Sequence, residues 1–208
     1  MNDTHPNFFF EQKLPIGMML TSKTLIPNAL RLNQVHGQQC YDLHYHPPSS
    51  PPGTYLEGDG WFWKWQNLKE NSNQLPCIIT ADCLPILILG KEGGLFVHAG
   101  WRGVQKKIYL HNCLKEIDPY FVYIGPSIQR AQFEVTAEFK ANFPDSAHFH
   151  FKNERITFDL QQEVKDNLLK NFPKITIQDS GICTFSDHRF HSFRREKIAT
   201  RNYHYFTL

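Results

Sequence analysis

The middle of the chain carries two apolar runs, each broken by a small group of polar residues. The runs are CIITADCLPILIL (77–89) and GGLFVHAGW (93–101). Continuous apolar runs of this length, punctuated by glycine, are typical of strands that are buried on both faces. Such strands need other elements on both sides of their sheet, so this feature constrains the fold more than any other.

Helical and strand patterns alternate after these runs. Apolar residues near helical spacing predict a helix over 104–117, and YFVYIGPSI (120–128) predicts a further strand. A four-residue apolar repeat predicts an amphipathic helix over 134–143, and a capping-box pattern that begins at Asp159 predicts another. The segment 174–185 is predicted as a late strand. This alternation of strands and helices predicts an α/β fold.

The segment before the apolar runs has weaker signals. Strand-forming residues in 31–46 predict one or two short strands, and HPPSSPPG (46–53) predicts a surface loop because proline interrupts helices and central strands. Trp61, Trp63 and Trp65 alternate as side chains on one face of a strand do. A half-buried aromatic face is the favoured interpretation, and a ligand platform is the alternative.

Length and composition limit the class of protein. A chain of 208 residues with 41% hydrophobic residues supports one domain over residues 1–208 and argues against wholesale disorder. The formal net charge of +2 argues against a general nucleic-acid binder, and no apolar run reaches the ~20 residues that a membrane helix needs. The five cysteines form no CxxC pair and no secretory signal is visible, so we expect reduced thiols in a cytoplasmic protein.

Polar residues lie inside or directly after the buried strands in three places, where an unpaired polar group is costly. Asp82 and Cys83 interrupt one apolar run, His98 lies near the end of the other, and His36 stands in QVHG before a glycine. One cysteine and two histidines are a suitable set of three zinc ligands, which leaves a fourth position for water or substrate. The spacings of 47 and 15 residues match no local metal motif. Structural, hydrogen-bonded histidines therefore stay open as an alternative.

Two further histidine pairs, His44/His46 and His148/His150, have the HxH form in which both side chains share one face of a strand. The first pair adjoins the proline-rich segment, and the second lies in the polar and aromatic stretch AHFHF. Exposed histidines are the favoured interpretation, and we assign no metal site to either pair.

Arginines offer a candidate anion site. Arg194 and Arg195 belong to a C-terminal stretch in which Arg189 and Arg201 also stand among hydroxyl and aromatic side chains. Arg102 stands near the predicted start of a helix, where free backbone N–H groups favour an anion. Arginine binds phosphate or carboxylate through two parallel hydrogen bonds. These arginines suggest a joint anion site, with a solvated charged surface as the alternative.

Six segments occur in an order that resembles one known family, the YfiH-like or "laccase-domain" polyphenol oxidase family. Its members are also described as purine nucleoside phosphorylases and as peptidoglycan editing factors. The resemblance covers about residues 31 to 202. The segments are QVHG (34–37), GDG (58–60), TADCLPILIL (80–89), VHAGWRG (97–103), GPSI…FEV (125–135) and CT…FHSFRRE…TRN (183–202).

The resemblance implies a single α/β domain with mixed β-sheets and flanking helices. It also implies zinc held by His36, Cys83 and His98, the same three residues that burial singles out. Family members are described as cleaving adenosine, inosine and methylthioadenosine with phosphate, and as deaminating adenosine. The laccase label would require copper, but a set with one thiolate and no cluster of HxH pairs suits zinc better than a multicopper centre.

The chain departs from the family pattern in three places. Its N-terminal region is shorter, and a glycine-rich segment is not recognisable there. The stretch 129–132 reads QRAQ where the family often has cysteines, and Thr200 stands where a glycine is usual. These differences leave the three proposed ligands intact and concern the substrate pocket.

The leading hypothesis is a zinc enzyme that acts on purine nucleosides. Cys83, Asp82 and His98 are the predicted catalytic residues, with Asp82 either orienting a ligand and moving a proton or capping its turn. Arg102, Arg194 and Arg195 are the candidates for the phosphate. The expected partners are a nucleoside and phosphate, with neither nucleic acid nor membrane. A hydrolase that edits peptidoglycan precursors and a non-catalytic metal-binding protein are the alternatives, and a copper oxidase is the least favoured.

Overall fold

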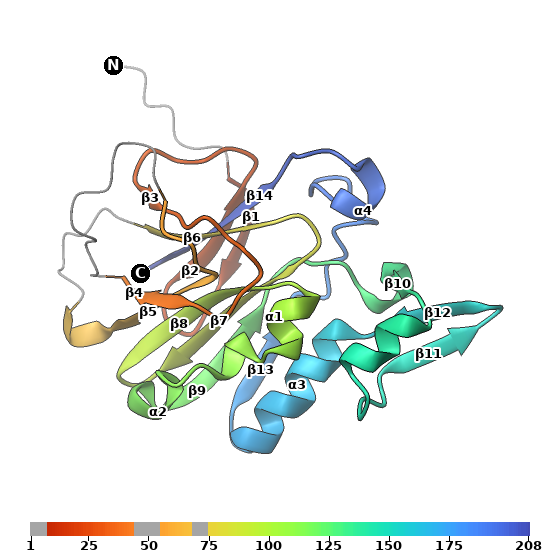
Figure 1. The fold of residues 1–208 in the computed structure, drawn as a ribbon. Coiled ribbons are helices and arrows are strands. Elements are labelled where there is room, and N and C mark those ends of the chain that lie inside the picture. The colour runs from red at the N-terminus through yellow and green to blue at the C-terminus, as the bar shows by residue number, and fades with distance from the viewer. Residues whose placement is uncertain (1–7, 44–54, 68–74) are drawn as a thin grey trace.

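The two apolar runs form the central strands of the protein, as predicted. The structure is a computed structural model that describes residues 8–43, 55–67 and 75–208 (Figure 1). The first run divides into β6 (Leu75–Thr80) and β7 (Leu84–Gly90), and the second forms β8 (Gly93–Ala99). Every residue of β7 and β8 is buried, which confirms strands covered on both faces. His44, His46 and the proline-rich segment at 46–53 lie outside the described residues.

The strands of the described residues form three sheets, two of which mix parallel and antiparallel pairs. The six-stranded sheet has the order β13 (Thr176–Asp179), β9 (Pro119–Ile124), β7, β8, β5 (Gly60–Lys64) and β4 (Cys40–Asp42). The five-stranded sheet has the order β1 (Phe8–Lys13), β2 (Met18–Ser22), β14 (Asn202–Thr207), β6 and β3 (Ala29–Leu30). A small sheet joins β10 (Glu134–Val135), β12 (Arg155–Phe158) and β11 (Phe149–Lys152).

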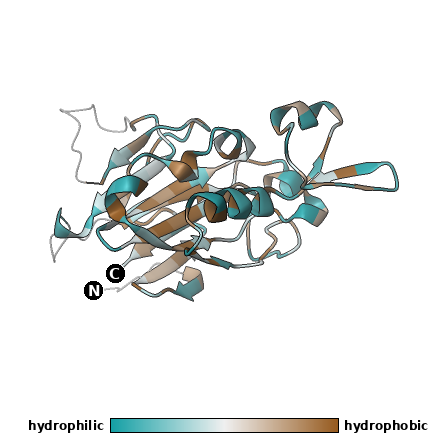
Figure 2. Cartoon of the chain, turned by 90° about the horizontal axis from the view of Figure 1, so that it is seen from below, coloured by the Kyte–Doolittle hydropathy of each residue, from teal (hydrophilic) through white to brown (hydrophobic). Residues whose placement is uncertain are grey.

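The six-stranded sheet lies between the five-stranded sheet and a layer of helices (Figure 1). Alternate residues of β7 belong to different cores, because side chains of a strand point to opposite faces. Ile86 and Ile88 pack with the helices, whereas Leu87 and Leu89 pack toward the five-stranded sheet. Figure 2 shows these central strands as hydrophobic and the helices over them as largely hydrophilic on the outside. The fold is therefore a mixed α/β domain, as the sequence predicted.

The aromatic strand that the tryptophans predicted is β5. Trp61 and Trp63 are buried, at 5% and 1% exposure, on the face that packs toward the five-stranded sheet. The Trp63 ring stacks on Phe206 of β14, with centroids 5.4 Å apart. Trp65 lies beyond the strand, in the 3-10 turn η1 (Trp65–Asn67). These tryptophans join the two larger sheets, so this face is core.

The predicted helix over 104–117 is wrong as a single element. The structure divides it into α1 (Trp101–Gln105), the 3-10 turn η2 (Ile108–Leu110) and α2 (Leu114–Ile117). Lys107 adopts a left-handed φ of 59°, which ends the first helical turn. The apolar spacing was correct nonetheless, because Ile108, Leu114 and Ile117 are all buried in the core beneath the helices.

The predicted helix over 134–143 is also wrong. Glu134 and Val135 pair with β12, and only the 3-10 turn η4 (Glu138–Asn142) follows. Phe139 and Phe143 both pack on Phe158, with ring centroids 5.7 Å and 4.7 Å apart. The four-residue spacing therefore reports aromatic packing onto a neighbouring strand rather than a helical stripe.

The helix predicted from Asp159 is confirmed as α3 (Leu160–Asn171). The Asp159 carboxylate accepts the backbone N–H of Gln162 at 2.9 Å and so caps the helix. The predicted late strand is confirmed as β13. Two short elements complete the description: η3 (Arg130–Gln132) and α4 (Phe193–Glu196). No helix in the described ranges is both long enough and apolar enough to cross a membrane.

A histidine is completely buried in the five-stranded sheet. His204 of β14 places Nδ1 3.0 Å from the Thr21 hydroxyl and Nε2 2.8 Å from the Thr80 hydroxyl. Burial, together with the nearby charge of His98, lowers the His204 pKa to about 3. The folded protein therefore holds this imidazole neutral, whereas the unfolded chain binds a proton at the ordinary pKa of 6.5.

We expect His204 to make the folded state sensitive to acid. Below pH 6.5 the unfolded chain binds one proton more than the folded protein at this position, so stability should fall toward the folded pKa of about 3. The contribution is up to about 1.4 kcal/mol per pH unit. Urea unfolding between pH 7 and pH 4 should show a shallower loss for His204→Gln, which keeps a donor and an acceptor. Equal slopes for both proteins would contradict this assignment.

Candidate metal centre

The structure brings the three predicted ligands together. The chain crosses from the five-stranded sheet to the six-stranded sheet between β6 and β7, and Cys83 lies at that crossing. Register then places His98 near it, because Leu84 pairs with Ala99 and Pro85 with His98. His36 comes from the segment between β3 and β4. The polar interruption that the sequence shows is therefore the turn that joins two sheets.

The ligand atoms face a common point. His36 Nε2 lies 4.0 Å from Cys83 Sγ, and the rings of His36 and His98 meet edge to face with centroids 4.8 Å apart. One nitrogen or sulfur atom from each of the three residues lies within 4.8 Å of the other two. Zinc bond lengths of about 2.0 to 2.3 Å need only a small inward movement of these atoms.

Asp59 holds two of the three ligands from behind. Its fully buried carboxylate accepts His98 Nδ1–H at 2.8 Å, and the backbone N–H groups of His36 at 3.0 Å and Gly37 at 2.6 Å. Occupying Nδ1 leaves Nε2 of His98 as the free ring nitrogen, which is the arrangement of a histidine ligand oriented by a carboxylate. Burial alone would raise the Asp59 pKa, but these hydrogen bonds together with the charge of His98 lower it, so the group is a carboxylate.

One glycine and one strained backbone position allow this close approach. A Cβ at Gly100 would lie 2.8 Å from the His36 ring and 3.0 Å from Cys83 Sγ, so a side chain there would push two ligands aside. His36 itself has a left-handed φ of 58°, which few residues other than glycine adopt. Such strain is retained where the surrounding structure fixes it, and here the Asp59 hydrogen bonds do so.

The electrostatics of the three side chains favour a thiolate. Burial alone would raise the Cys83 pKa, but the charge of His98 and hydrogen bonds from both histidines lower it to about 6. Burial would lower the His98 pKa, but the Cys83 thiolate and Asp59 raise it to about 9. A thiolate and two imidazoles that exchange protons for a metal suit a borderline-soft ion. A metal must displace a proton from His98 below about pH 9 and also from Cys83 below about pH 6, so metal binding is expected to weaken as the pH falls.

A cavity of about 430 Å³ opens beside the three ligands. Two arginines contribute to its wall. Arg31 stacks on Tyr55 at 4.0 Å, and its buried Nε has no hydrogen-bond partner among the described residues. Arg201 bonds only backbone carbonyls, those of Ile198 and Thr200, in the described part of the chain. The lining residues are Arg31, Leu32, Asn33, Gln34, His36, Ile79, Thr80, Ala81, Cys83, His98, Phe193 and Arg201.

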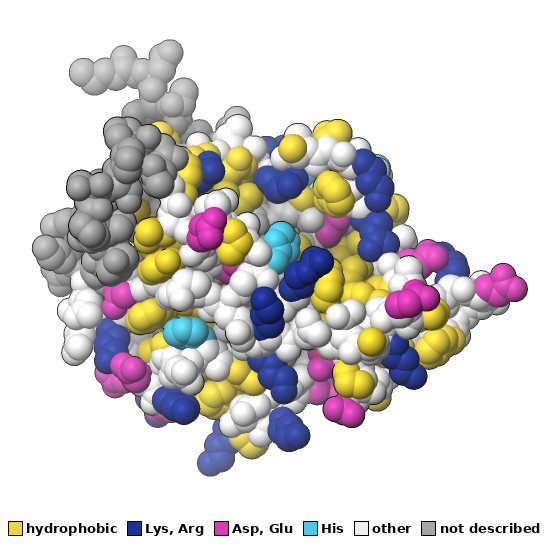
Figure 3. All heavy atoms as spheres, viewed as in Figure 1, with side chains coloured by type: hydrophobic (Ala, Val, Ile, Leu, Met, Phe, Trp, Pro, Cys, Tyr) yellow, Lys and Arg dark blue, Asp and Glu magenta, His cyan; other side chains and the backbone are white. Residues whose placement is uncertain are grey.

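The other predicted arginines lie elsewhere. Arg102, Arg194 and Arg195 are not among the described residues that line this cavity. Arg102 stacks on Trp101 at 4.2 Å, and Arg194 donates to the Glu134 carbonyl at 2.9 Å. Arg195 binds the carbonyl groups of three residues, Thr184, Phe185 and Phe190. Lysine and arginine side chains gather over α1 and α4 on the face shown in Figure 3.

Asp82 does not face the ligands with a free carboxylate. One oxygen accepts the Thr184 hydroxyl at 2.7 Å and the other accepts the Arg194 backbone N–H at 2.7 Å. Its φ of 88° is left-handed, and its carbonyl accepts the Ile128 N–H at 2.9 Å. Of the two roles considered from the sequence, this geometry corresponds to fixing the turn.

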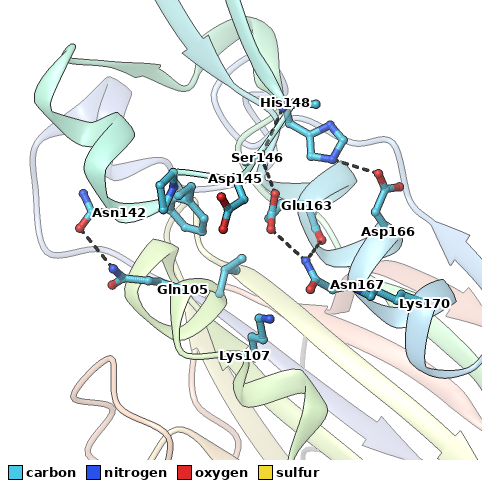
Figure 4. Close-up of a pocket in the computed structure, with 14 residues that line it drawn as sticks. Gln105, Lys107, Asn142, Asp145, Ser146, His148, Glu163, Asp166, Asn167 and Lys170 are labelled. Atoms are coloured by element: carbon cyan, nitrogen blue, oxygen red, sulfur yellow. Dashed lines mark hydrogen bonds and ion pairs between the residues drawn. The ribbon is translucent and has the colours of Figure 1, made fainter.

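The histidines of the second HxH pair have separate partners. His148 Nε2 lies 3.0 Å from the Asp166 carboxylate, whereas His150 contacts the Arg130 guanidinium at 3.2 Å. His148 lines another cavity, of about 440 Å³, between α1, α3 and the loop that follows η4 (Figure 4). The polar side chains of that cavity are largely paired with one another: Glu163, for example, binds Ser146 and Asn167. We therefore assign the chemistry to the cavity beside Cys83.

The fold and the site together define a mixed α/β protein with a Cys/His/His group that could hold a metal ion. Comparison with known protein families identifies the family to which this chain belongs. The family described as "Multi-copper polyphenol oxidoreductase laccase" matches residues 18–206. The chain belongs to this family, which confirms the resemblance drawn from its motifs.

Relatives and solved structures agree with this assignment. An Aquifex aeolicus protein named purine nucleoside phosphorylase is 35% identical over 157 residues, 73% of this chain and 70% of that protein. A Campylobacter jejuni protein named purine nucleoside phosphorylase is 29% identical and is matched over 64% of this chain but only 62% of its own length. The structure of Bacillus licheniformis YfiH aligns with a TM-score of 0.69 at 19% identity, covering 87% of this chain and 74% of that one. Geobacillus stearothermophilus YlmD gives a TM-score of 0.68 at 24% identity, covering 86% and 72% respectively. These structural likenesses show the fold.

Sequence reasoning missed two residues of the site. Asp59 was visible only as the centre of GDG, and its isolation between glycines in an apolar, aromatic stretch was the available signal. Arg31 lies five positions before His36, in a short stretch whose sequence shows no clear helix or strand pattern and so gave no signal for this residue. The relation of both residues to the site depends on the path of the segment that carries His36, and the sequence alone does not give this path.

Removing the thiolate should remove the metal. We expect purified protein to hold about one equivalent of zinc per chain and Cys83→Ala to hold little, because two imidazoles alone bind zinc poorly. Cys183→Ala is the matched control, since Cys183 is a free, partly buried cysteine outside the three ligands. Elemental analysis by mass spectrometry measures this. Equal zinc in Cys83→Ala would contradict the site.

Asp59→Asn should weaken metal binding without removing a ligand. An amide can present an N–H to His98 Nδ1 and favour the wrong tautomer, so zinc affinity should fall by about 10- to 100-fold. Competition with a chelating dye measures the affinity. Asp187→Asn, at a surface carboxylate paired with Arg189, should leave it unchanged. Unaltered affinity in a folded Asp59→Asn protein would show that Asp59 does not orient the ligand.

Proposed function

We propose that this protein is a zinc-dependent purine nucleoside phosphorylase. The substrates would be adenosine, inosine or methylthioadenosine together with phosphate, and the products a free base and a sugar 1-phosphate. One observation carries the proposal: a single cavity is lined by the three ligands and by two arginines with few partners among the described residues. The names of the relatives in Aquifex and Campylobacter support it.

Zinc is the metal that the donor set favours. One thiolate and two imidazoles form a three-ligand zinc site with an open position. The family description names copper, but a multicopper centre needs more imidazole ligands than the three residues found together here. Bound zinc would supply a Lewis acid and would lower the pKa of a coordinated water. His36, Cys83 and His98 would hold it, with Asp59 orienting His98.

The arginines of the cavity would bind the anion. In phosphorolysis a phosphate oxygen attacks the sugar C1′, the C1′–N bond breaks, and the base leaves with the electron pair and takes up a proton. A guanidinium that binds two phosphate oxygens places the nucleophile and balances its charge. Arg31 and Arg201 can reach this role from the cavity wall. They replace Arg102, Arg194 and Arg195 as our candidates, because those three residues are not among the described residues that line the cavity.

Deamination of adenosine is a second proposed activity of the same site. The three-ligand set leaves a position for water, and attack of water at purine C6 would release ammonia and form inosine. The remaining hypotheses are a peptidoglycan-precursor hydrolase, a non-catalytic metal-binding protein and a copper oxidase. All three predict neither free base nor inosine from a nucleoside, so a nucleoside assay separates them from the two proposed activities.

The protein should be incubated with adenosine, inosine or methylthioadenosine, with and without phosphate, after its metal content has been measured. Free base and sugar 1-phosphate that appear only with phosphate would support phosphorolysis, and inosine formed from adenosine would support deamination. Cys83→Ala should abolish both. Absence of base and of inosine with zinc-loaded protein would overturn the proposal and favour the hydrolase or binding-protein alternatives.

Replacing the cavity arginines should weaken phosphate binding selectively. We expect Arg31→Gln and Arg201→Gln each to raise the KM for phosphate by roughly tenfold or more, because each would remove a charged hydrogen-bond donor. Arg189→Gln is the matched control, since the Arg189 guanidinium is paired with Asp187 outside the cavity. An unchanged KM for phosphate in both cavity variants would place the anion elsewhere.

A further inference from the structure

One large aromatic side chain stands open at the wall of the candidate active site. Phe193 lines the cavity together with His36, Cys83 and His98, yet its side chain is 51% exposed. Two residues just before it are covered, since Ser192 is 1% exposed and Phe190 is fully buried, whereas residues 197–200 after α4 are exposed. Single exposed apolar side chains are common on protein surfaces, so it is the place of Phe193 at the wall of this cavity, rather than its exposure alone, that points to a ligand.

The turn that carries this ring is fixed from several sides. Phe193 begins α4, in which the Ser192 hydroxyl caps the Arg195 N–H at 3.2 Å. The Arg195 guanidinium donates to the Phe190 carbonyl at 2.6 Å and also to the carbonyls of two residues further upstream. The Asn202 side chain brackets the backbone of His191, with two hydrogen bonds of 2.8 Å. The backbone on each side of Phe193 is therefore held in place while its ring stays open.

Asp82 ties this turn directly to the metal ligands. Its carboxylate accepts the Arg194 N–H at 2.7 Å, one residue after Phe193, and the Thr184 hydroxyl at 2.7 Å. Asp82 is also the residue immediately before Cys83. A single two-residue turn therefore places the thiolate and anchors the helix that carries the ring. That link explains why a buried carboxylate stands next to a ligand without facing the ligand group.

We infer that Phe193 is the platform on which the purine ring stacks, and that Asp82 is the positioning residue that holds this platform relative to the metal centre. The inference rests on the proposed function and names the subsite for the base. Purines present a flat aromatic face, and stacking on phenylalanine binds any purine without requiring particular ring substituents. Lys197 Nζ stands over one face of the ring, 5.7 Å from its centroid, so the base would take the other face.

The same arrangement gives a place to each of the two substrates, the nucleoside and the phosphate. The base lies on Phe193, the anion lies at Arg31 and Arg201, and the sugar spans between them in front of the ligand group. Both arginines and Phe193 line one cavity of about 430 Å³, which is within the usual range of small-molecule sites. A stacked base without hydrogen-bonded substituents fits an enzyme that accepts adenosine, inosine and methylthioadenosine alike.

The test compares Phe193→Leu with Phe193→Tyr on zinc-loaded protein. Leucine keeps apolar volume but lacks an aromatic face, so the KM for inosine should rise roughly 5- to 100-fold, with the KM for phosphate and the zinc content unaltered. Tyrosine should restore the KM for inosine. Phe151→Leu is the matched control, because Phe151 is a 66% exposed phenylalanine on β11 outside the cavity.

The outcomes distinguish failure of the Phe193 stacking role from failure of the proposed function. An unchanged KM for inosine in Phe193→Leu, with the unaltered protein active, would overturn the stacking role and leave the proposed function intact. Loss of turnover and of zinc together in Phe193→Leu would also overturn it, since that result describes a structural residue. An unaltered protein that neither binds nor cleaves inosine would overturn the proposed function and this inference with it.

Asp82→Asn supplies the second variant. The amide can accept one of the two hydrogen bonds that the carboxylate accepts now, so α4 should lose part of its anchor. A positioning role predicts that the KM for inosine rises more than the KM for phosphate, while zinc stays bound. Equal changes in both KM values, or a lower kcat with unaltered KM values, would contradict it.

Discussion

The buried carboxylate of Asp59 is the interaction on which the site depends. It lies on the six-stranded sheet side of the molecule and accepts hydrogen bonds from His98 Nδ1 and from the backbone of His36 and Gly37. The Asp59 side chain therefore connects His98, on the well-packed strand β8, to the irregular segment that carries His36. An unpaired carboxylate at zero exposure would be costly, so the segment and the imidazole must both stay where they satisfy it.

The rest of the site follows from where the chain changes sheets. The turn between β6 and β7 joins the two larger sheets, and its two polar residues have different contacts. Cys83 faces His36 and His98, whereas Asp82 faces α4 and holds the C-terminal segment. The wall of the cavity thus combines side chains from the beginning, middle and end of the chain. The turn between buried strands thus brings together three candidate metal ligands, two arginines and one exposed aromatic ring.

Much of this could be predicted from the sequence, for physical reasons that differ by element. The buried strands and α3 were predictable because apolar runs and an Asp159 cap act locally. The three candidate ligands could be singled out because polar residues within buried strands are rare, and the structure brings them together. The prediction of a helix over 134–143 was wrong because the position of Phe139 is set by its tertiary contact with Phe158 and not by helical periodicity. Arg31 could not be found, since its place depends on the path of an irregular segment.

We propose that His36, Cys83 and His98 form one metal centre at the wall of the cavity that takes the nucleoside. Crystals of the purified protein, measured with X-rays on both sides of the zinc absorption edge, test it most directly. We expect one anomalous peak within bonding distance of His36 Nε2, Cys83 Sγ and His98 Nε2, and this peak should vanish below the zinc edge. Zinc-loaded protein with no peak between these atoms, or a peak that follows the copper edge instead, would contradict it.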